Sequence, residues 1–158
     1  MREQTIWCYG NLIGESSLLR QHFFTNKILL KILDVVNDIN ATKSITRISM
    51  WLMCQITKGK PSPKYEDVNY LFIKMSVCIK TVTSSLWLND EEVIGYALQI
   101  LTFLTYSDNQ FSGLIFSSNC LQKLVEFAYV KKKKFNIPCL RIIGNLLCID
   151  NTAEVFIQ

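Results

Sequence analysis

Apolar residues recur at helical spacing along most of the chain. They do so in Ile28 to Val36, Tyr70 to Ile79 and Val93 to Leu104, and polar or capping residues bound each segment. A recurrence every three or four residues places the apolar side chains on one face of an α-helix. Strand-like alternation is hard to find, so the pattern predicts an all-α protein.

Short polar or glycine-containing segments interrupt these helices. They are Gly14 to Ser16, Asn37 to Thr42, Gly59 to Pro63 and Ser107 to Asn109. Because Gly, Pro, Asn and Ser favour turns, these interruptions predict about ten short helices. Brief connections of this kind are typical of stacked helical hairpins rather than of a four-helix bundle.

Two positions, four residues apart, recur at long intervals. We call them the first and second ladder positions, and consecutive pairs begin 44, 48 and 42 residues apart. The four pairs are Trp7/Asn11, Trp51/Gln55, Gln99/Phe103 and Arg141/Asn145. This period suits a three-helix armadillo-type repeat, in which each unit buries its apolar faces against its neighbours.

The repeat predicts an all-α, right-handed armadillo solenoid of about three and a half to four repeats. Residues 1–158 would form one armadillo segment. Its repeat pieces are expected at about 1–14, 15–59, 60–107, 108–150 and 151–158.

Composition is compatible with this fold. The 158 residues are 49% hydrophobic and 19% charged, enough for a continuous core. No apolar run approaches the roughly 18 residues that span a membrane, and the N-terminus lacks the pattern of a secretory signal. The net charge of +4 is a weak hint of acidic partners, concentrated at Lys131 to Lys134. A solvated loop is the expected role of that run, since no aromatic residues alternate with the lysines as they would for nucleic-acid stacking.

Six cysteines are widely separated and form no CxxC pair. They are Cys8, Cys54, Cys78, Cys120, Cys139 and Cys148. We expect buried free thiols in a reducing compartment rather than a disulfide framework or a zinc site.

Catalytic patterns are not found. His22 is the only histidine, and no Ser or Cys near it is arranged as a nucleophile. Phosphate-binding glycine motifs are absent, and Glu91 and Glu92 suit the first turn of a helix better than an acid/base pair. We therefore expect neither an enzyme nor a bound cofactor.

The residues around the ladder resemble the importin-α family, adaptors that recognise nuclear localisation signals. Trp7 and Asn11, with Glu3-Gln4 before them and Gly14-Glu15 after, resemble the third helix of an internal repeat of that family. The order of the ladder matches as well: two Trp/amide repeats, then an aromatic residue at the Asn position, then Arg at the Trp position with Asn retained. Pro138 to Arg141 resembles the family's Pro-Ala-Leu-Arg, and Gly59 to Pro63 its lysine- and proline-containing turn.

The resemblance covers essentially the whole chain. By that alignment the chain is expected to begin inside repeat three and to end as repeat seven starts, without the importin-β-binding arm and the outer repeats. The resemblance also implies localisation to the cytoplasm and the nucleus, a protein or peptide partner, and no membrane contact.

The resemblance further implies a peptide-binding groove. Trp7, Asn11 and Glu15 are spaced i, i+4, i+8 and therefore fall close to one stripe of a helix. In the family, the amide bonds the backbone of an extended peptide, the indoles flank lysine stems, and nearby acids meet the ammonium groups. The implied peptide-binding residues are Trp7, Asn11, Glu15, Trp51, Gln55, Arg141 and Asn145.

Some residues depart from the family pattern. Gln55 adds a rotatable bond to the amide clamp, Gln99 removes an indole, and Tyr96 stands where the family usually has an acid. Two functions therefore remain open: an adaptor for lysine-rich localisation signals, and a divergent armadillo scaffold with a vestigial groove in a larger assembly.

Both ends are expected to present apolar surface. The candidates are Ile6, Leu12 and Ile13 in the first helix and Val155, Phe156 and Ile157 in the last segment. Because solenoids need polar caps, we expect association at the ends, through another protein or by self-stacking.

Overall fold

The computed structural model describes residues 2–25, 28–58, 84–86, 88–107, 109–116 and 120–148. The helix expected at Tyr70 to Ile79 and the turn at Gly59 to Pro63 lie outside these residues, as does the apolar segment Val155 to Ile157. The helices are α1 (Arg2–Glu15), α2 (Ser17–Thr25), α3 (Ile28–Asn37), α4 (Lys43–Lys58), α6 (Glu91–Ser107), α7 (Asn109–Phe116), α8 (Leu121–Tyr129) and α9 (Lys133–Leu147). The described residues contain no strand, and the all-α prediction is confirmed.

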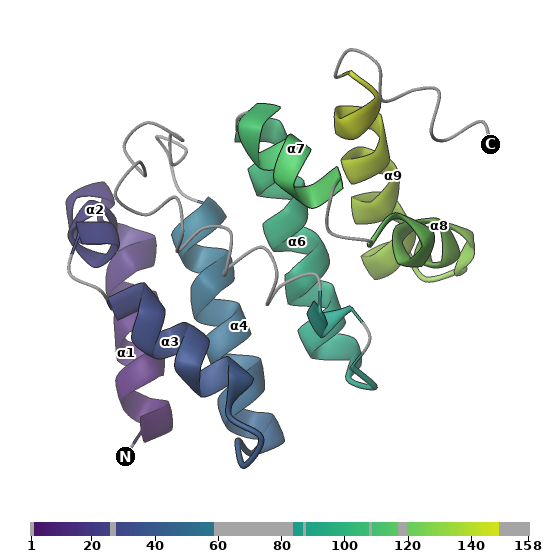
Figure 1. Cartoon of the computed structure of the whole chain (residues 1–158). Coiled ribbons are helices and arrows are strands. Elements are labelled where there is room, and N and C mark those ends of the chain that lie inside the picture. The colour runs from purple at the N-terminus through teal and green to yellow at the C-terminus, as the bar shows by residue number, and fades with distance from the viewer. Residues whose placement is uncertain are drawn as a thin grey trace.

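Four helices, α1, α4, α6 and α9, stand side by side in a row (Figure 1). Each packs against the next, and each carries one pair of ladder positions. The shorter helices complete the units: α3 packs on α4, α2 joins α1 to α3, and α7 and α8 pack against α6 and α9. Helices that carry the same ladder register therefore line one side of the molecule.

The core is continuous along this row. In α4 the buried apolar side chains include Met50, Leu52 and Met53, and in α6 Leu98 and Leu101. Further buried residues are Ile32 and Leu33 of α3, Phe111 of α7, Leu124 of α8 and Ile142 and Leu146 of α9. Since each helix buries its apolar stripe against neighbouring helices, no unit forms a separate core.

The predicted turns are held by short polar side chains that cap the next helix. Ser16 Oγ accepts a hydrogen bond from the Leu19 amide at 3.3 Å, and Thr42 Oγ1 accepts one from the Ile45 amide at 3.3 Å. These bonds satisfy amides that a helix N-terminus leaves unpaired. The turn predicted at Asn37 to Thr42 is confirmed from Asp38 on, whereas the one predicted at Gly14 to Ser16 is shorter, because Gly14 and Glu15 still belong to α1 and only Ser16 lies between the helices.

Asp90 performs the same task for α6. Its Oδ1 accepts hydrogen bonds from the amides of Glu92 at 3.1 Å and Val93 at 3.3 Å. Glu91 and Glu92 consequently lie in the first turn of α6, as predicted, where negative charge is favoured by the helix dipole.

The loop expected at Lys131 to Lys134 is only partly correct. Lys131 and Lys132 precede α9, but Lys133 and Lys134 belong to its first turn. This run also makes specific contacts rather than being only solvated, because Lys132 and Lys134 both pair with Glu91.

Two other expectations need correction. Cys54, Cys120 and Cys139 are buried free thiols as predicted, whereas Cys8 and Cys148 are exposed; Cys78 lies outside the described residues. In the first helix Leu12 is exposed and Ile6 half-buried, but Ile13 is fully buried. The reason is that α4 packs against α1, and the side of α1 that faces α4 is covered.

Within the described residues, no helix has the length and apolar character to cross a membrane.

Candidate peptide-binding groove

The ladder helices are stacked with a fixed stagger, which Trp51 and Gly10 define. The Trp51 ring lies directly over Gly10, so a Cβ on Gly10 would come within 2.1 Å of Trp51 Cζ3. Gly10 is three residues beyond Trp7, the first ladder position of α1. In this pair, the first ladder residue of α4 therefore lies over α1, at a point three residues beyond the first ladder position of α1.

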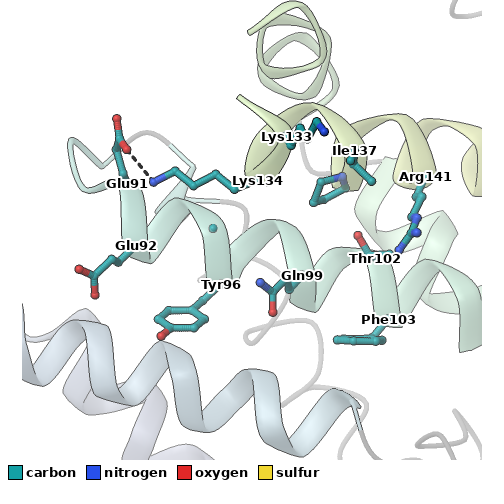
Figure 2. A pocket seen from close by; sticks show the side chains of 12 residues that line it. Glu91, Glu92, Tyr96, Gln99, Thr102, Phe103, Lys133, Lys134, Ile137 and Arg141 are labelled. Atoms are coloured by element: carbon teal, nitrogen blue, oxygen red, sulfur yellow. Dashed lines mark hydrogen bonds and ion pairs between the residues drawn. The ribbon is translucent and has the colours of Figure 1, made fainter. Parts of the chain in front are cut away.

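The same stagger recurs along the row. Gln99 Oε1 accepts a hydrogen bond from Cys54 Sγ at 3.3 Å, and Cys54 is three residues beyond Trp51. Figure 2 shows Arg141 extending from α9 toward Thr102, which is three residues beyond Gln99. One geometric rule thus places first ladder residues at each contact between neighbouring ladder helices.

Among the described residues, two hollows are found between these helices. The N-terminal hollow, between α1, α4 and α6, has a volume of about 730 Å³ and is lined by Trp7, Lys43, Ser44, Arg47, Ile48, Trp51, Glu92 and Tyr96. The C-terminal hollow, between α6 and α9, has a volume of about 480 Å³ (Figure 2). Its lining is Glu91, Glu92, Gly95, Tyr96, Gln99, Thr102, Phe103, Lys133, Lys134, Ile137, Pro138 and Arg141. Glu92 and Tyr96 line both hollows, so the two are neighbours along the ladder helices, and we call them together the groove.

The predicted site residues divide between these hollows and other surroundings. Trp7, which is 57% exposed, and the half-buried Trp51 line the N-terminal hollow. Arg141 lines the C-terminal hollow. The linings include none of the second ladder amides and do not include Glu15, which ends α1 with an exposed side chain.

The amides at the second ladder position have different surroundings. Asn145 Nδ2 donates a hydrogen bond to Thr105 Oγ1 of α6 at 3.0 Å. Gln55 Oε1 faces Gly14 of α1, 3.8 Å from where a Cβ would stand. Asn11 is exposed. Asn145 therefore already uses one amide hydrogen within the chain. Gln55 lies next to α1, and Asn11 is open to solvent.

Sequence reasoning missed the residues one helical turn before the Trp position. Arg47 precedes Trp51 by four residues, and Ile137 precedes Arg141 by four. Because residues four apart share a helix face, extending the ladder stripe by one turn would have found both. Lys43, Lys133 and Lys134 lie one further turn along the same two helices.

The acids of the groove are paired with cations of the chain itself. Arg47 Nε lies 3.0 Å from Asp90 Oδ2, and Arg47 Nη1 lies 3.3 Å from Glu92 Oε1. Burial of Asp90 raises its pKa, but the hydrogen bonds from Val93 and Arg47 outweigh this effect, so the pKa of Asp90 is lowered overall.

Glu91 is held by two lysines, one just before α9 and one in its first turn. Lys132 pairs with Oε1, and Lys134 Nζ lies 2.6 Å from Oε2, the contact drawn in Figure 2. The hydrogen bonds from Lys132 and Lys134 lower the pKa of Glu91 to about 2. Lys43, Lys133 and Arg141 form no ion pair among the described residues. The groove is therefore mixed in charge rather than acidic.

The groove offers aromatic, amide and charged side chains for binding. No three His, Cys, Asp or Glu side chains of the described residues are grouped so as to hold a metal ion. Hollows lined in this way on successive helices suit an extended polypeptide.

The row of ladder helices, their constant stagger and the groove along them define the class of protein: the chain is an armadillo-repeat α-solenoid. A designed armadillo repeat protein in complex with the peptide (KR)4 superposes with a TM-score of 0.79 at 16% identity, over 94% of this chain and 59% of that one. Computationally designed armadillo repeat proteins for modular peptide recognition superpose with a TM-score of 0.76 at 12% identity, over 91% of this chain and 57% of that one. At such identities the likeness concerns the fold.

In sequence, the chain is similar to importin-α subunits, and the resemblance predicted from the ladder is confirmed. It is 28% identical to importin subunit alpha-1b of Oryza sativa subsp. japonica over 151 residues, 96% of this chain and 27% of the relative. It is 29% identical to importin subunit alpha-5 of Arabidopsis thaliana over 126 residues, 80% of this chain and 23% of the relative. The chain thus spans about a quarter of the length of these relatives. No protein-family model matches it.

Proposed function

We propose that this chain is an importin-α-like adaptor segment that holds an extended peptide in the groove along α1, α4, α6 and α9. The ligand class is a basic peptide of the nuclear-localisation type, and the work is nuclear import, in the cytoplasm and the nucleus. The observation that carries the proposal is that Trp7, Trp51 and Tyr96 meet in one open hollow. The similarity to importin-α subunits supports the same ligand class.

The N-terminal hollow has the features that a lysine side chain needs. Aromatic faces attract an ammonium group by cation–π interaction and pack along the methylene stem. Glu92 supplies a carboxylate at the same hollow, although Arg47 already contacts it. Because Lys43 and Arg47 also line this hollow and repel a basic peptide, we expect weaker binding than an acidic groove would give.

A scaffold is the second candidate, and the internal pairing of groove residues favours it. Glu91, Glu92 and Asn145 all contact a neighbouring ladder helix of the chain itself. A groove whose polar groups stabilise the helix stack would serve as a structural module of a larger assembly.

The two candidates differ in what they predict for peptide titrations. A fluorescein-labelled (KR)4 peptide would be titrated by anisotropy at low and high salt, with an acidic (ED)4 and a neutral (QS)4 peptide for comparison. The adaptor proposal predicts saturable binding of (KR)4 that weakens with salt. Trp7→Ala should weaken it roughly 3- to 30-fold, the range of a cation–π contact.

Tyr129→Ala is the matched control, because Tyr129 is an exposed aromatic residue of α8 outside the groove lining. It should leave the affinity for (KR)4 unchanged. Equal affinity for (QS)4, or no saturation at about 500 µM protein, would reject the adaptor proposal in favour of the scaffold.

A further inference from the structure

The outer face of α9 repeats the surface on which α1 receives α4. Gly144 is three residues beyond Arg141, the register that Gly10 holds beside Trp7. In α1 this glycine is covered by the Trp51 ring, whereas a Cβ on Gly144 would meet nothing within 4 Å. The seat for a first ladder side chain therefore exists on α9, and none of the described residues fills it.

Exposed apolar side chains border this seat. Leu140 is 60% exposed and Leu147 is 41% exposed, and the two lie four residues before and three residues after Gly144. This spacing puts them on the same face of α9. A helix laid on that face would bury both.

Helix α1 has the matching features. Trp7 occupies the first ladder position and is 57% exposed, and Leu12 on the same helix is also exposed. The cations of α9 do not oppose this: Lys133, Lys134 and Arg141 line the hollow on the α6 side, so the outer face is mainly apolar. A helix with an exposed indole at the first ladder position is what the open glycine register of α9 would accept.

We propose that a second copy of this chain stacks its α1 on α9, with its Trp7 seated over Gly144 as Trp51 is seated over Gly10. The observed stagger then fixes other contacts. Because Gln55 faces Gly14 within the chain, Asn11 of the second copy should face Cys148 of the first. The two surfaces differ, so the contact is head-to-tail and continues beyond a dimer.

Sedimentation of the 158-residue chain over about 5 to 500 µM, without peptide, tests this proposal. The weight-average mass should rise with concentration past that of a dimer. Gly144→Leu should weaken association at least tenfold, because the added side chain occupies the seat.

Gly113→Leu is the matched control, since Gly113 is also an exposed helical glycine with nothing within 4 Å of a Cβ. It should associate like the unmodified chain. Circular dichroism should show that both variants are folded. A monomeric mass at all concentrations, or equal association of the two leucine variants, would overturn the proposal.

A cross-link locates the contact independently. In a Cys8→Ser background, Asn11→Cys should form a disulfide with Cys148 of another copy when oxidised glutathione is added, giving a series of covalent oligomers. Gln122→Cys, an exposed position on α8, should not. Equal cross-linking from both positions would contradict the predicted register. Since no peptide is present, failure here leaves the peptide-binding proposal untouched.

Discussion

Gly10 fixes the distance between the first two ladder helices. Its missing side chain leaves the space that the Trp51 ring occupies, and the indole thereby becomes half-buried at the edge of the N-terminal hollow. The requirement is steric, because no Cβ fits 2.1 Å from an aromatic carbon. A glycine in the middle of a helix costs about 1 kcal/mol in helix propensity. Here the packing of the Trp51 ring, which the glycine permits, offsets that cost.

We therefore predict that Gly10→Ala destabilises the fold. Moving a packed indole costs about 1–3 kcal/mol, which exceeds the gain of up to about 1 kcal/mol in helix propensity. Chemical denaturation would give the free energy of unfolding.

Gly113→Ala is the comparison for this prediction, because its Cβ would meet nothing within 4 Å and only the propensity gain remains. It should stabilise the chain by a few tenths to about 1 kcal/mol. If the two alanine variants change stability in the same direction, the Trp51 contact does not hold α1 and α4 in the way described.

At the scale of elements, α6 and α9 are joined by an ion cluster at their N-terminal ends. Glu91 of α6 receives Lys132 and Lys134 from the start of α9, and its pKa is lowered to about 2 from an ordinary value of 4.5. The cluster is exposed, so its contribution is small and is screened by salt.

The lowered pKa of Glu91 predicts a pH dependence of stability. A carboxyl whose pKa is lower in the folded state stabilises the fold above its unfolded pKa, and this contribution is lost as the pH falls from about 4.5 toward 2. Urea midpoints of the unmodified chain should therefore fall more steeply over this interval than those of Glu91→Gln.

Glu126→Gln is the control, because Glu126 pairs with Lys123 inside α8 and joins no second helix. High salt should reduce the difference between Glu91→Gln and the unmodified chain. Parallel pH profiles for these two proteins at low salt would show that the α6–α9 cluster does not contribute.

The elements were more predictable than the contacts between them. Helical periodicity located α3 and α6, because apolar stripes are local properties of sequence. The caps Ser16 and Thr42 lie in segments that were predicted only as turns. The pairing of Arg47 with Asp90 joins residues 43 apart. No local pattern encodes such a pair, and it appears only once the stagger of the helices is known.

At the scale of the whole molecule, the 44-residue recurrence of the ladder positions was enough to predict an armadillo solenoid. It also placed Trp7 and Trp51 on one groove, and they do line the same hollow. The role of Asn145 was less predictable, since its bond to Thr105 depends on how closely α9 approaches α6. The ion pairs between groove residues of the chain itself were also hard to predict, because they depend on how the helices pack and not on a local sequence motif.

The division of the chain into repeat pieces at about 1–14, 15–59, 60–107, 108–150 and 151–158 stays a prediction, as does the role of Glu15. Glu15 is exposed at the end of α1, where a carboxylate could meet a cation of a bound peptide. Its place in the peptide site depends on whether the peptide extends past Trp7 along α1.

The central claim is that the ladder face, rather than the outer helices, binds peptide. Photo-cross-linking tests it most directly: a (KR)4 peptide with a diazirine side chain at one end is irradiated with the chain, and cross-linked residues are mapped by mass spectrometry. We predict labelling of the N-terminal hollow, at Trp7, Trp51 or Tyr96, that an excess of unlabelled (KR)4 removes. Competed labelling confined to α2, α3, α7 or α8 would contradict the claim.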